Sequence, residues 1–344
     1  MKASTELPIV PSGSPTQSFF TDPLRIRTIL VAVDFSDESF RALNFALLLA
    51  KRFHSSVQLL YVYEGKPSFT SVGDKPELFL DPAVELFSEH EISGRLKDEV
   101  GRRFSIDLPL KDCHFRMGRP SPEICATAHK LNADLIVLAT HGDTGLKHLT
   151  LGSTAEKVVR HANCPVLVVR EAASGSPKSD AEGIVLRKIL VPVDFSECAT
   201  EGAKYASVFA ARAGANLLLM HVVQPPDYFT TDALTENGDT SPLLAAARLE
   251  AQKNLNELVA SFPHDGVPME TQVEVGFASE KLAEAMKRPD VDMVITSTHG
   301  YTGLRHALIG STAEQLLRLA RCPVLVVPSH NREMSNTDAH DPGL

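Results

Sequence analysis

Two stretches of the chain are continuously apolar, and each is followed by a segment with helical periodicity. "TILVAVD" (28–34) and "KILVPVD" (188–194) show almost no polar alternation, as expected for a parallel strand that is covered on both faces. Behind the first run, "SDESFRALNFALLLAKRF" (36–53) carries apolar residues at helical spacing after a Ser-Asp start. The pattern predicts a buried strand followed by an amphipathic helix.

The remaining segments of the first half continue this alternation of strand and helix. Strands are predicted at 57–63, 110–116, 134–140 and 165–169, and helices at 83–104, 121–131 and 153–162, with a Pro- and Gly-bearing loop over 64–82. The second half repeats the order through Val327. Because right-handed crossovers join consecutive parallel strands, this order predicts a doubly wound α/β sheet of five parallel strands in each half.

An internal repeat shows that the two halves are copies of one domain. "RTILVAVDFS" (27–36) returns as "RKILVPVDFS" (187–196) with eight of ten letters identical, and residues 135–169 match 293–327 at 20 of 35 positions. The repeat is far too long for a solenoid unit. It predicts two tandem domains with the following limits: a flexible tail at 1–24, domains at 25–171 and 187–328, a linker at 172–186 with the small, polar letters "ASGSPKSDAEG", and a flexible tail at 329–344.

The composition of the chain limits which classes of partner and which cellular compartment are expected. The 344 residues, 43% of them hydrophobic, are enough for two cores. The formal charge is −9 and the basic residues are scattered, which argues against a nucleic-acid partner. Five cysteines without a C-x-x-C pair fit reduced thiols, and neither a signal-peptide pattern nor an apolar run of membrane-spanning length is visible. A soluble, cytoplasmic protein away from membranes is the expectation.

The candidate site lies where the first and fourth strands of each half end. In an open parallel sheet, ligands bind at the carboxyl ends of strands where the winding reverses, so Asp34 and Thr140 would flank one site. Gly142 and Gly152 bracket nine residues. The Gly152-Ser153-Thr154 turn opens a helix whose N–H groups suit phosphate oxygens. Glycine at these positions permits close approach of a ligand or a positive φ. The second half supplies the equivalent residues Asp194, Gly300, Gly310, Ser311 and Thr312.

The stretches "VAVDFS" and "ATHGDTGLKHLTLGSTAEKVVRHANCPVLVV", each with a counterpart in the other half, closely resemble the universal stress protein family, here as a tandem two-domain member. The resemblance covers about 26–170 and 187–328. It implies an adenine nucleotide alpha hydrolase-like fold and a regulatory stress-response protein that binds ATP, or ADP or AMP, with Mg²⁺ as an option beside the nucleotide. Asp34 and Asp194 would approach the adenosine, and the backbone of Val62 and Val222 the adenine edge.

The family's phosphate-binding pattern is Gly, two residues, Gly, nine residues, then Gly before Ser or Thr. This chain fits from the second glycine onward and departs at the first, where Ala139 and Ser297 stand. By resemblance, the pattern assigns the following residues to the two phosphate sites: Ala139, His141, Gly142, Gly152, Ser153 and Thr154, and Ser297, His299, Gly300, Gly310, Ser311 and Thr312. Both replacements are small, so the site is expected to persist.

Several of these candidate site residues can also be explained by a purely structural role. Asp34 and Asp194 can be turn or N-cap residues, and Ser153 and Ser311 can be plain helix caps, a role that is compatible with phosphate binding. His141 and His299 have no nucleophile motif beside them, so a structural role in the loop competes with a catalytic one. The equivalent cysteines Cys164 and Cys322 fit buried small residues rather than redox centres.

Known catalytic motifs are missing from the sequence. Neither the P-loop pattern with its lysine nor the dinucleotide pattern G-x-G-x-x-G is present. A nucleotide-binding regulatory protein without efficient catalysis is therefore favoured. Two alternatives stay open: an interaction scaffold that binds no nucleotide, and a slow ATP hydrolase or phosphotransferase.

The last strand of each half should lie at a sheet edge. "CPVLVVR" and "CPVLVVP" close the two halves, and an exposed apolar edge is an aggregation hazard. Pairing of 165–169 with 323–327 removes both edges. Since single-domain members of the resembling family dimerise through this strand, the chain would be a covalently linked pseudo-dimer. A further homo-oligomer stays open.

Overall fold

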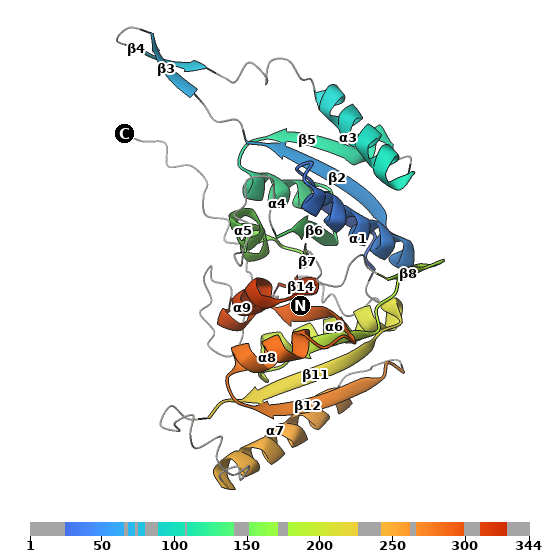
Figure 1. The fold of residues 1–344 in the computed structure, drawn as a ribbon, viewed down its shortest axis with the longest axis vertical. Coiled ribbons are helices and arrows are strands. Elements are labelled where there is room, and N and C mark those ends of the chain that lie inside the picture. Colours follow the sequence, from blue (N-terminus) through green and yellow to red (C-terminus); the bar gives the residue numbers. More distant parts are fainter. Residues whose placement is uncertain are drawn as a thin grey trace, which may run out of the picture.

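A computed structural model describes ten stretches of the chain: 25–64, 68–72, 75–79, 89–106, 109–140, 151–170, 178–225, 242–261, 266–298 and 310–328. Between 68 and 79, and at 89, only the backbone is described. The two predicted tails lie outside these residues. Figure 1 shows the two halves stacked along the longest axis of the molecule, with the last strands of each half at the centre.

The first half contains the predicted alternation of strands and helices. Its elements are β1 (Thr28–Ala32), α1 (Asp37–Phe53), β2 (Ser56–Tyr63), β3 (Ser68–Val72), β4 (Lys75–Phe79), α3 (Glu89–Phe104), a 3₁₀ turn (Leu110–Asp112), β5 (Cys113–Met117), α4 (Pro120–Lys130), β6 (Leu135–Ala139), α5 (Ser153–His161) and β7 (Val166–Val169). The prediction of a plain loop at 64–82 was wrong in part, because β3 and β4 form an antiparallel hairpin there.

The second half repeats this order after a short hairpin. Its elements are β8 (Ser179–Asp180), β9 (Gly183–Ile184), β10 (Lys188–Pro192), α6 (Glu197–Ala213), β11 (Asn216–Val223), α7 (Pro242–Ala260), β12 (Met269–Val275), α8 (Ala278–Met286), β13 (Val291–Ser297), α9 (Ser311–Leu319) and β14 (Val324–Val327). β8 and β9 pair antiparallel with each other.

All ten central strands join in one sheet of order β12-β11-β10-β13-β14-β7-β6-β1-β2-β5. Pairing is parallel within each half, whereas β14 and β7 are antiparallel, with Leu325 opposite Leu167. The predicted fold is confirmed in this respect: two five-stranded doubly wound sheets pair through their last strands. Neither of these two strands is left as an exposed edge.

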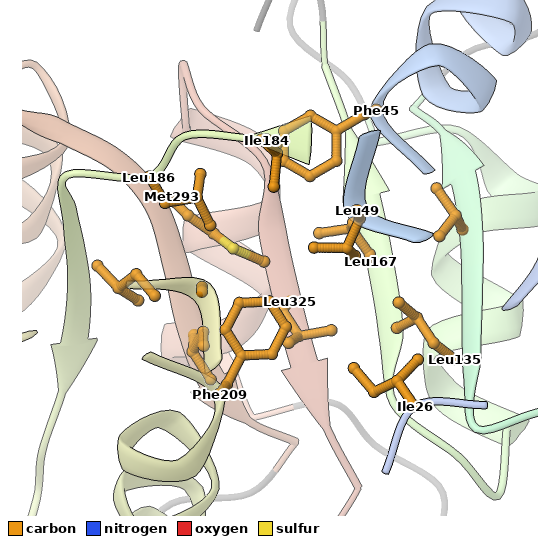
Figure 2. Close-up of a cluster of buried hydrophobic side chains, with 14 of the residues drawn as sticks. Ile26, Phe45, Leu49, Leu135, Leu167, Ile184, Leu186, Phe209, Met293 and Leu325 are labelled. Atoms are coloured by element: carbon orange, nitrogen blue, oxygen red, sulfur yellow. The ribbon is translucent and has the colours of Figure 1, made fainter. Parts of the chain in front are cut away.

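Successive residues of the central strands alternate between two apolar cores. In β1, Ile29 and Val31 face the core that contains α1, α3, α6 and α7, whereas Leu30 faces the core that contains α4, α5, α8 and α9. The first core runs through both halves, and the rings of Phe53 and Phe209 meet across the boundary with centroids 4.9 Å apart. Figure 2 shows Leu167, Leu325 and Phe209 in this shared core. The halves are thus packed together as well as paired.

The hairpin between the halves is anchored rather than free. Arg52 of α1 forms ion pairs with Asp180 (3.1 Å) and Glu182 (3.0 Å), and its Nε donates to the carbonyl of Ile184 (3.2 Å). The side chain of Ile184 is fully buried beside Phe45 (Figure 2). The polar letters of 173–183 predicted a flexible linker, whereas residues 178–184 form a strap across α1. The apolar letters "GIVL" (183–186), at the end of the predicted linker 172–186, are the signal for this contact.

Tyr205 of α6 buries a hydroxyl that has no hydrogen-bond partner among the described residues. The repeat places Phe45 at the equivalent position of the first half. Because an unsatisfied buried hydroxyl loses its water contacts without compensation, Tyr205→Phe should leave the free energy of unfolding unchanged or raise it by up to about 1 kcal/mol. Urea denaturation of the two proteins measures this. A clear loss of stability would mean that the hydroxyl has a partner, such as a bound water.

Candidate functional site

The strand ends that were predicted to flank the site are neighbours in the sheet. β1 pairs with β6 in parallel, with Ile29 opposite Leu135, and β10 pairs with β13, with Ile189 opposite Met293. The chain leaves β1 toward β2 on one side and returns to β6 on the other, so the winding reverses between β1 and β6. Each half therefore has its switch point between its first and fourth strands, as the sequence predicts.

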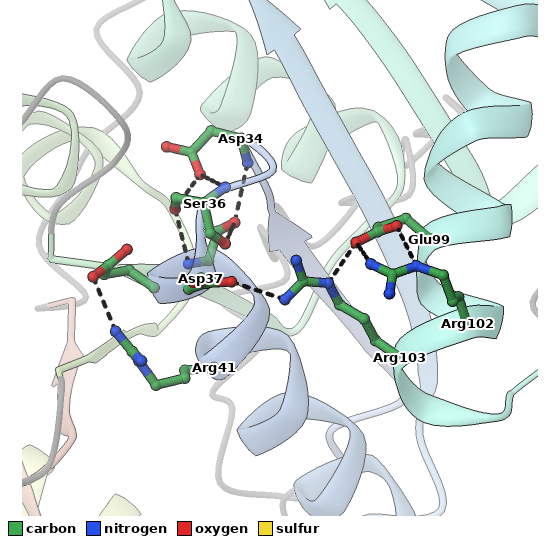
Figure 3. Close-up of polar contacts among 9 residues, drawn as sticks. Asp34, Ser36, Asp37, Arg41, Glu99, Arg102 and Arg103 are labelled. Atoms are coloured by element: carbon green, nitrogen blue, oxygen red, sulfur yellow. Dashed lines mark hydrogen bonds and ion pairs between the residues drawn. The ribbon is translucent and has the colours of Figure 1, made fainter.

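Asp34 organises the turn that leaves β1. Its Oδ1 accepts hydrogen bonds from the Ser36 N–H (3.0 Å) and hydroxyl (2.5 Å), and Ser36 Oγ in turn accepts from the Ser39 N–H (3.1 Å), as Figure 3 shows. Ser36 is thus the N-cap of α1, and Asp34 is the turn residue that orients it. Asp194 holds Ser196 in the same way, at 3.0 and 2.6 Å.

An ion-pair chain ties this turn to α3. Arg103 binds Asp37 at 2.9 Å and Glu99 at 2.5 Å (Figure 3). Its guanidinium carbon lies 4.2 Å from the ring centroid of Phe40. Hydrogen bonds from Arg102 and Arg103 lower the pKa of the Glu99 carboxyl to about 2. The first turn of α1, next to Asp34, is therefore held from a second helix.

Backbone strain follows the aspartate in both halves. Phe35 and Phe195 have φ of 66° and 61°, a left-handed conformation that costs a bulky residue about 1–3 kcal/mol. Aromatic contacts hold both rings, with centroids 5.1 Å from Tyr61 and 4.5 Å from His221 respectively. Sequence reasoning missed this feature, although the identical "DFS" letters of the two halves were a signal. The same strained turn thus occurs beside both switch points.

The backbone of Val62 faces the site edge. Peptide groups along a strand alternate between its two neighbours. The Leu60 carbonyl accepts from Val33 N–H on the β1 side (2.9 Å), and the Tyr63 carbonyl accepts from Gly118 N–H on the β5 side (3.0 Å). Val62 therefore presents its peptide groups toward the β1 side, beyond the last paired residue of β1. In the second half, corresponding bonds join Val193 to Met220 and Gly276 to Val223, which gives Val222 the same orientation.

Hydrogen bonds close the base of each predicted phosphate loop. Thr140 N–H donates to the Val169 carbonyl of β7 (3.2 Å), and Gly152 N–H donates to the Thr140 carbonyl (2.9 Å). The second half repeats both bonds at Thr298, with Val327 (3.0 Å) and Gly310 (2.7 Å). Each helix start is thereby held at the end of the fourth strand. The loops themselves, with His141, Gly142, His299 and Gly300, lie outside the described residues.

The helices after the loops begin without a side-chain cap. Gly152 and Gly310 are the N-cap residues, and neither α5 nor α9 has a side-chain capping hydrogen bond among the described residues. The plain-cap role considered for Ser153 and Ser311 was wrong, since both are the first residue inside the helix. At φ of −60° and −58°, the two glycines do not need a positive φ, which leaves close approach as the reason for glycine. The N–H groups of the first turn point out of the helix start.

The small residues at the first motif position pack away from these helix starts. A Cβ built on Gly202 of α6 would lie 3.5 Å from Cβ of Ser297. Ala139 likewise packs on the core that contains α1, where Ala42 occupies the position equivalent to Gly202. The serine thus faces a glycine on the neighbouring helix. Neither departure from the family pattern fills the space at the start of α5 or α9.

The two site edges also differ at the position of Tyr61. In the first half, Tyr61 is partly buried, and its pKa is raised by burial and by the charge of Asp34, against an opposing effect of Arg95. In the second half, His221 takes this position and its Nδ1 hydrogen-bonds the Val193 carbonyl at 2.7 Å. Asp34 is half-buried, whereas Asp194 is exposed.

Burial reduces the acidity of two of the cysteines. All five cysteines are free thiols, and burial raises the pKa of Cys164 and Cys322 to about 12, so neither forms a thiolate readily near neutral pH. In the described stretches, no group of three or more His, Cys, Asp or Glu residues could hold a metal ion. No helix in these stretches has the length and apolar character needed to cross a membrane.

Both halves match one known family. The sequence profile of the Universal stress protein family matches residues 25–170 and 186–328. The chain belongs to the universal stress protein family. A universal stress protein of Methanocaldococcus jannaschii is 36% identical over 147 residues, which cover 42% of this chain and 82% of that protein. A universal stress protein from Archaeoglobus fulgidus has a similar structure, with a TM-score of 0.58, 19% identity, and coverage of 90% and 99% of the two chains.

A third universal stress protein was solved in complex with cAMP. It aligns with 42% of this chain and 98% of its own length, with 19% identity and a TM-score of 0.30. The family match and the Archaeoglobus fulgidus structure show the family's fold over most of the chain, as two tandem universal stress protein domains.

Proposed function

We propose that each half binds an adenine nucleotide, with ATP as the main candidate and ADP or AMP as others, and that the protein acts as a nucleotide-binding regulator in a stress response. The starts of α5 and α9 carry this proposal, because they are held beside the ends of β6 and β13 and have no side-chain cap from any described residue. Free N–H groups and the positive end of the helix dipole attract phosphate oxygens.

The remaining contacts follow from the geometry of the edge. The phosphates would lie at Gly152-Ser153-Thr154, the ribose near Asp34, and the adenine edge at the peptide groups of Val62. In the second half, Gly310-Ser311-Thr312, Asp194 and Val222 take these roles. If Mg²⁺ accompanies the nucleotide, it would bind phosphate oxygens together with a hydroxyl of this turn.

Efficient catalysis is not part of this proposal. The sequence has no P-loop lysine, and the Ser36 and Ser196 hydroxyls that Asp34 and Asp194 hold are helix N-caps. Turnover should be much slower than the roughly 1–1,000 per second usual for enzymes. Phosphate release from ATP by the pure protein, and mass analysis of nucleotide released on denaturation, test this. Rapid turnover that is lost in Asp34→Ala would instead support the hydrolase alternative.

Replacing one glycine at a time should remove one nucleotide site at a time. Gly152→Val places a branched side chain where the phosphates approach the start of α5, so the first site should be lost while the second persists; Gly310→Val should do the reverse. Titration calorimetry with ATP should show two sites in the wild type and one in each variant. If stoichiometry and affinity are unchanged in both variants, the phosphates do not bind at these helix starts. If the wild type binds no nucleotide, the result would support the alternative of an interaction scaffold that binds no nucleotide.

A further inference from the structure

Arg170 connects the first half to a helix of the second. It follows β7 directly, and its Nη1 donates hydrogen bonds to the carbonyls of Arg318 and Ala320 (3.3 Å for the latter) at the carboxyl end of α9. Burial lowers the pKa of the guanidinium, although arginine remains charged at neutral pH. The equivalent residue of the second half is Pro328, which has no such donor. Pro328 therefore cannot make the equivalent contact with the end of α5.

The helix that Arg170 holds is the one whose other end forms the proposed second phosphate site. α9 has nine residues, so about 13 Å separate its two ends, and a rigid rod of that length passes a tilt at one end to the other. At its start, Gly310 is fixed to the Thr298 carbonyl. The residue before Arg170, Val169, accepts the bond from Thr140 that supports the first site. Val169 thus accepts a bond at the base of the first site, and the next residue, Arg170, holds the helix that begins at the second site.

We infer that Arg170 is a positioning residue for the second nucleotide site. This inference rests on the proposed function. Arg170 satisfies the Arg318 carbonyl in the last turn of α9 and the carbonyl of the C-cap residue Ala320, and it places a cation at the negative end of the helix dipole. Both effects keep the start of α9 aimed at the phosphates of a bound nucleotide. In the second half, Pro328 stands where a second arginine would be and cannot donate such hydrogen bonds to the end of α5.

The test isolates the second site in the Gly152→Val background and compares ATP with adenosine, which lacks phosphates. Arg170→Met should weaken ATP binding roughly five- to tenfold, leave adenosine binding unchanged, and be partly rescued by Arg170→Lys. Arg321→Met, an exposed arginine next to the contact, is the matched control and should have no effect. In the Gly310→Val background, the first site should be insensitive to Arg170→Met.

Two results would overturn the inference alone. One is unchanged ATP affinity at the second site of Arg170→Met. The other is an equal loss of ATP and adenosine binding, which would indicate a general loss of structure. Absence of ATP binding by the wild-type chain is a different result, since it refutes the proposed function itself and the positioning role with it.

Discussion

Gly183→Ala should lower the free energy of unfolding by about 2–4 kcal/mol. Gly183 has φ of +122°, a conformation that L side chains rarely adopt. A Cβ there would lie 2.4 Å from the Leu48 carbonyl oxygen and 2.9 Å from the Arg52 nitrogen, and both are backbone atoms of α1 that cannot rotate away. The hairpin must therefore move off α1.

The upper limit of this loss is the stability that the hairpin contributes. Detachment would expose Ile184, whose burial is worth about 1.5–3 kcal/mol, and would break the contacts of Arg52 with Asp180 and Glu182. Because the side chains of Asp180 and Glu182 are largely exposed, their ion pairs with Arg52 contribute little to the free energy of unfolding. Urea denaturation gives the change in midpoint.

Gly214→Ala is the control for the positive φ alone. Gly214 ends α6 at φ of 69°, and a Cβ there would have no atom within 4 Å. His54 occupies the equivalent end of α1 at φ of 55°, so a side chain is tolerated, and the expected loss is about 1 kcal/mol. If Gly183→Ala cost no more than Gly214→Ala, the strap would not be in close contact with α1.

Most of the fold was predictable because the strands and the helices that form both cores follow local patterns of apolar and polar residues. The continuous apolar letters of β1 and β10 predict strands covered on both faces, and these strands lie at the middle of each half. The duplication then fixes the order of elements twice. The identical apolar letters that close each half also predicted the β7–β14 pair, because an unpaired edge of that composition is unfavourable.

The features that the sequence did not predict depend on contacts between distant residues or on local backbone geometry. The strap at 178–184 consists mainly of polar letters, and its contact with Arg52 spans more than 120 positions. The left-handed φ of Phe35 follows from packing against Tyr61 rather than from its own preference. The contact of Arg170 with α9 likewise joins two halves, and no periodicity reveals it.

The candidate site was predicted in outline and corrected in detail. The neighbouring strand ends and the glycine at each helix start were predicted by the motif spacing. The motif could not show whether glycine or serine is the N-cap, because both residue types are favoured there. The orientation of Ser297 toward Gly202 depends on a helix about 95 residues away in sequence, and it explains how the chain can depart from the family's first glycine.

An isolated first half, residues 1–178, should form a dimer, whereas the full chain should not associate through this strand. In the full chain, β7 pairs antiparallel with β14, and both have the letters "VLVV". Leu167 lies opposite Leu325 at the centre of the pair, with Val166 opposite Val326 and Val168 opposite Val324. A second copy of β7 can therefore replace β14 in the same register, with Leu167 opposite Leu167 about a twofold axis.

The driving force is the apolar surface that removal of the second half exposes. Leu167 is fully buried, and Phe53 would lose its contact with Phe209. Light scattering on both proteins gives the comparison, and far-UV circular dichroism separates a folded dimer from an unfolded aggregate. A folded half that stays monomeric at high concentration would contradict the expectation. Pairing of β7 with β14 would then depend on the rest of the second half, such as the contact of Arg170 with α9, rather than on the complementarity of the two strands.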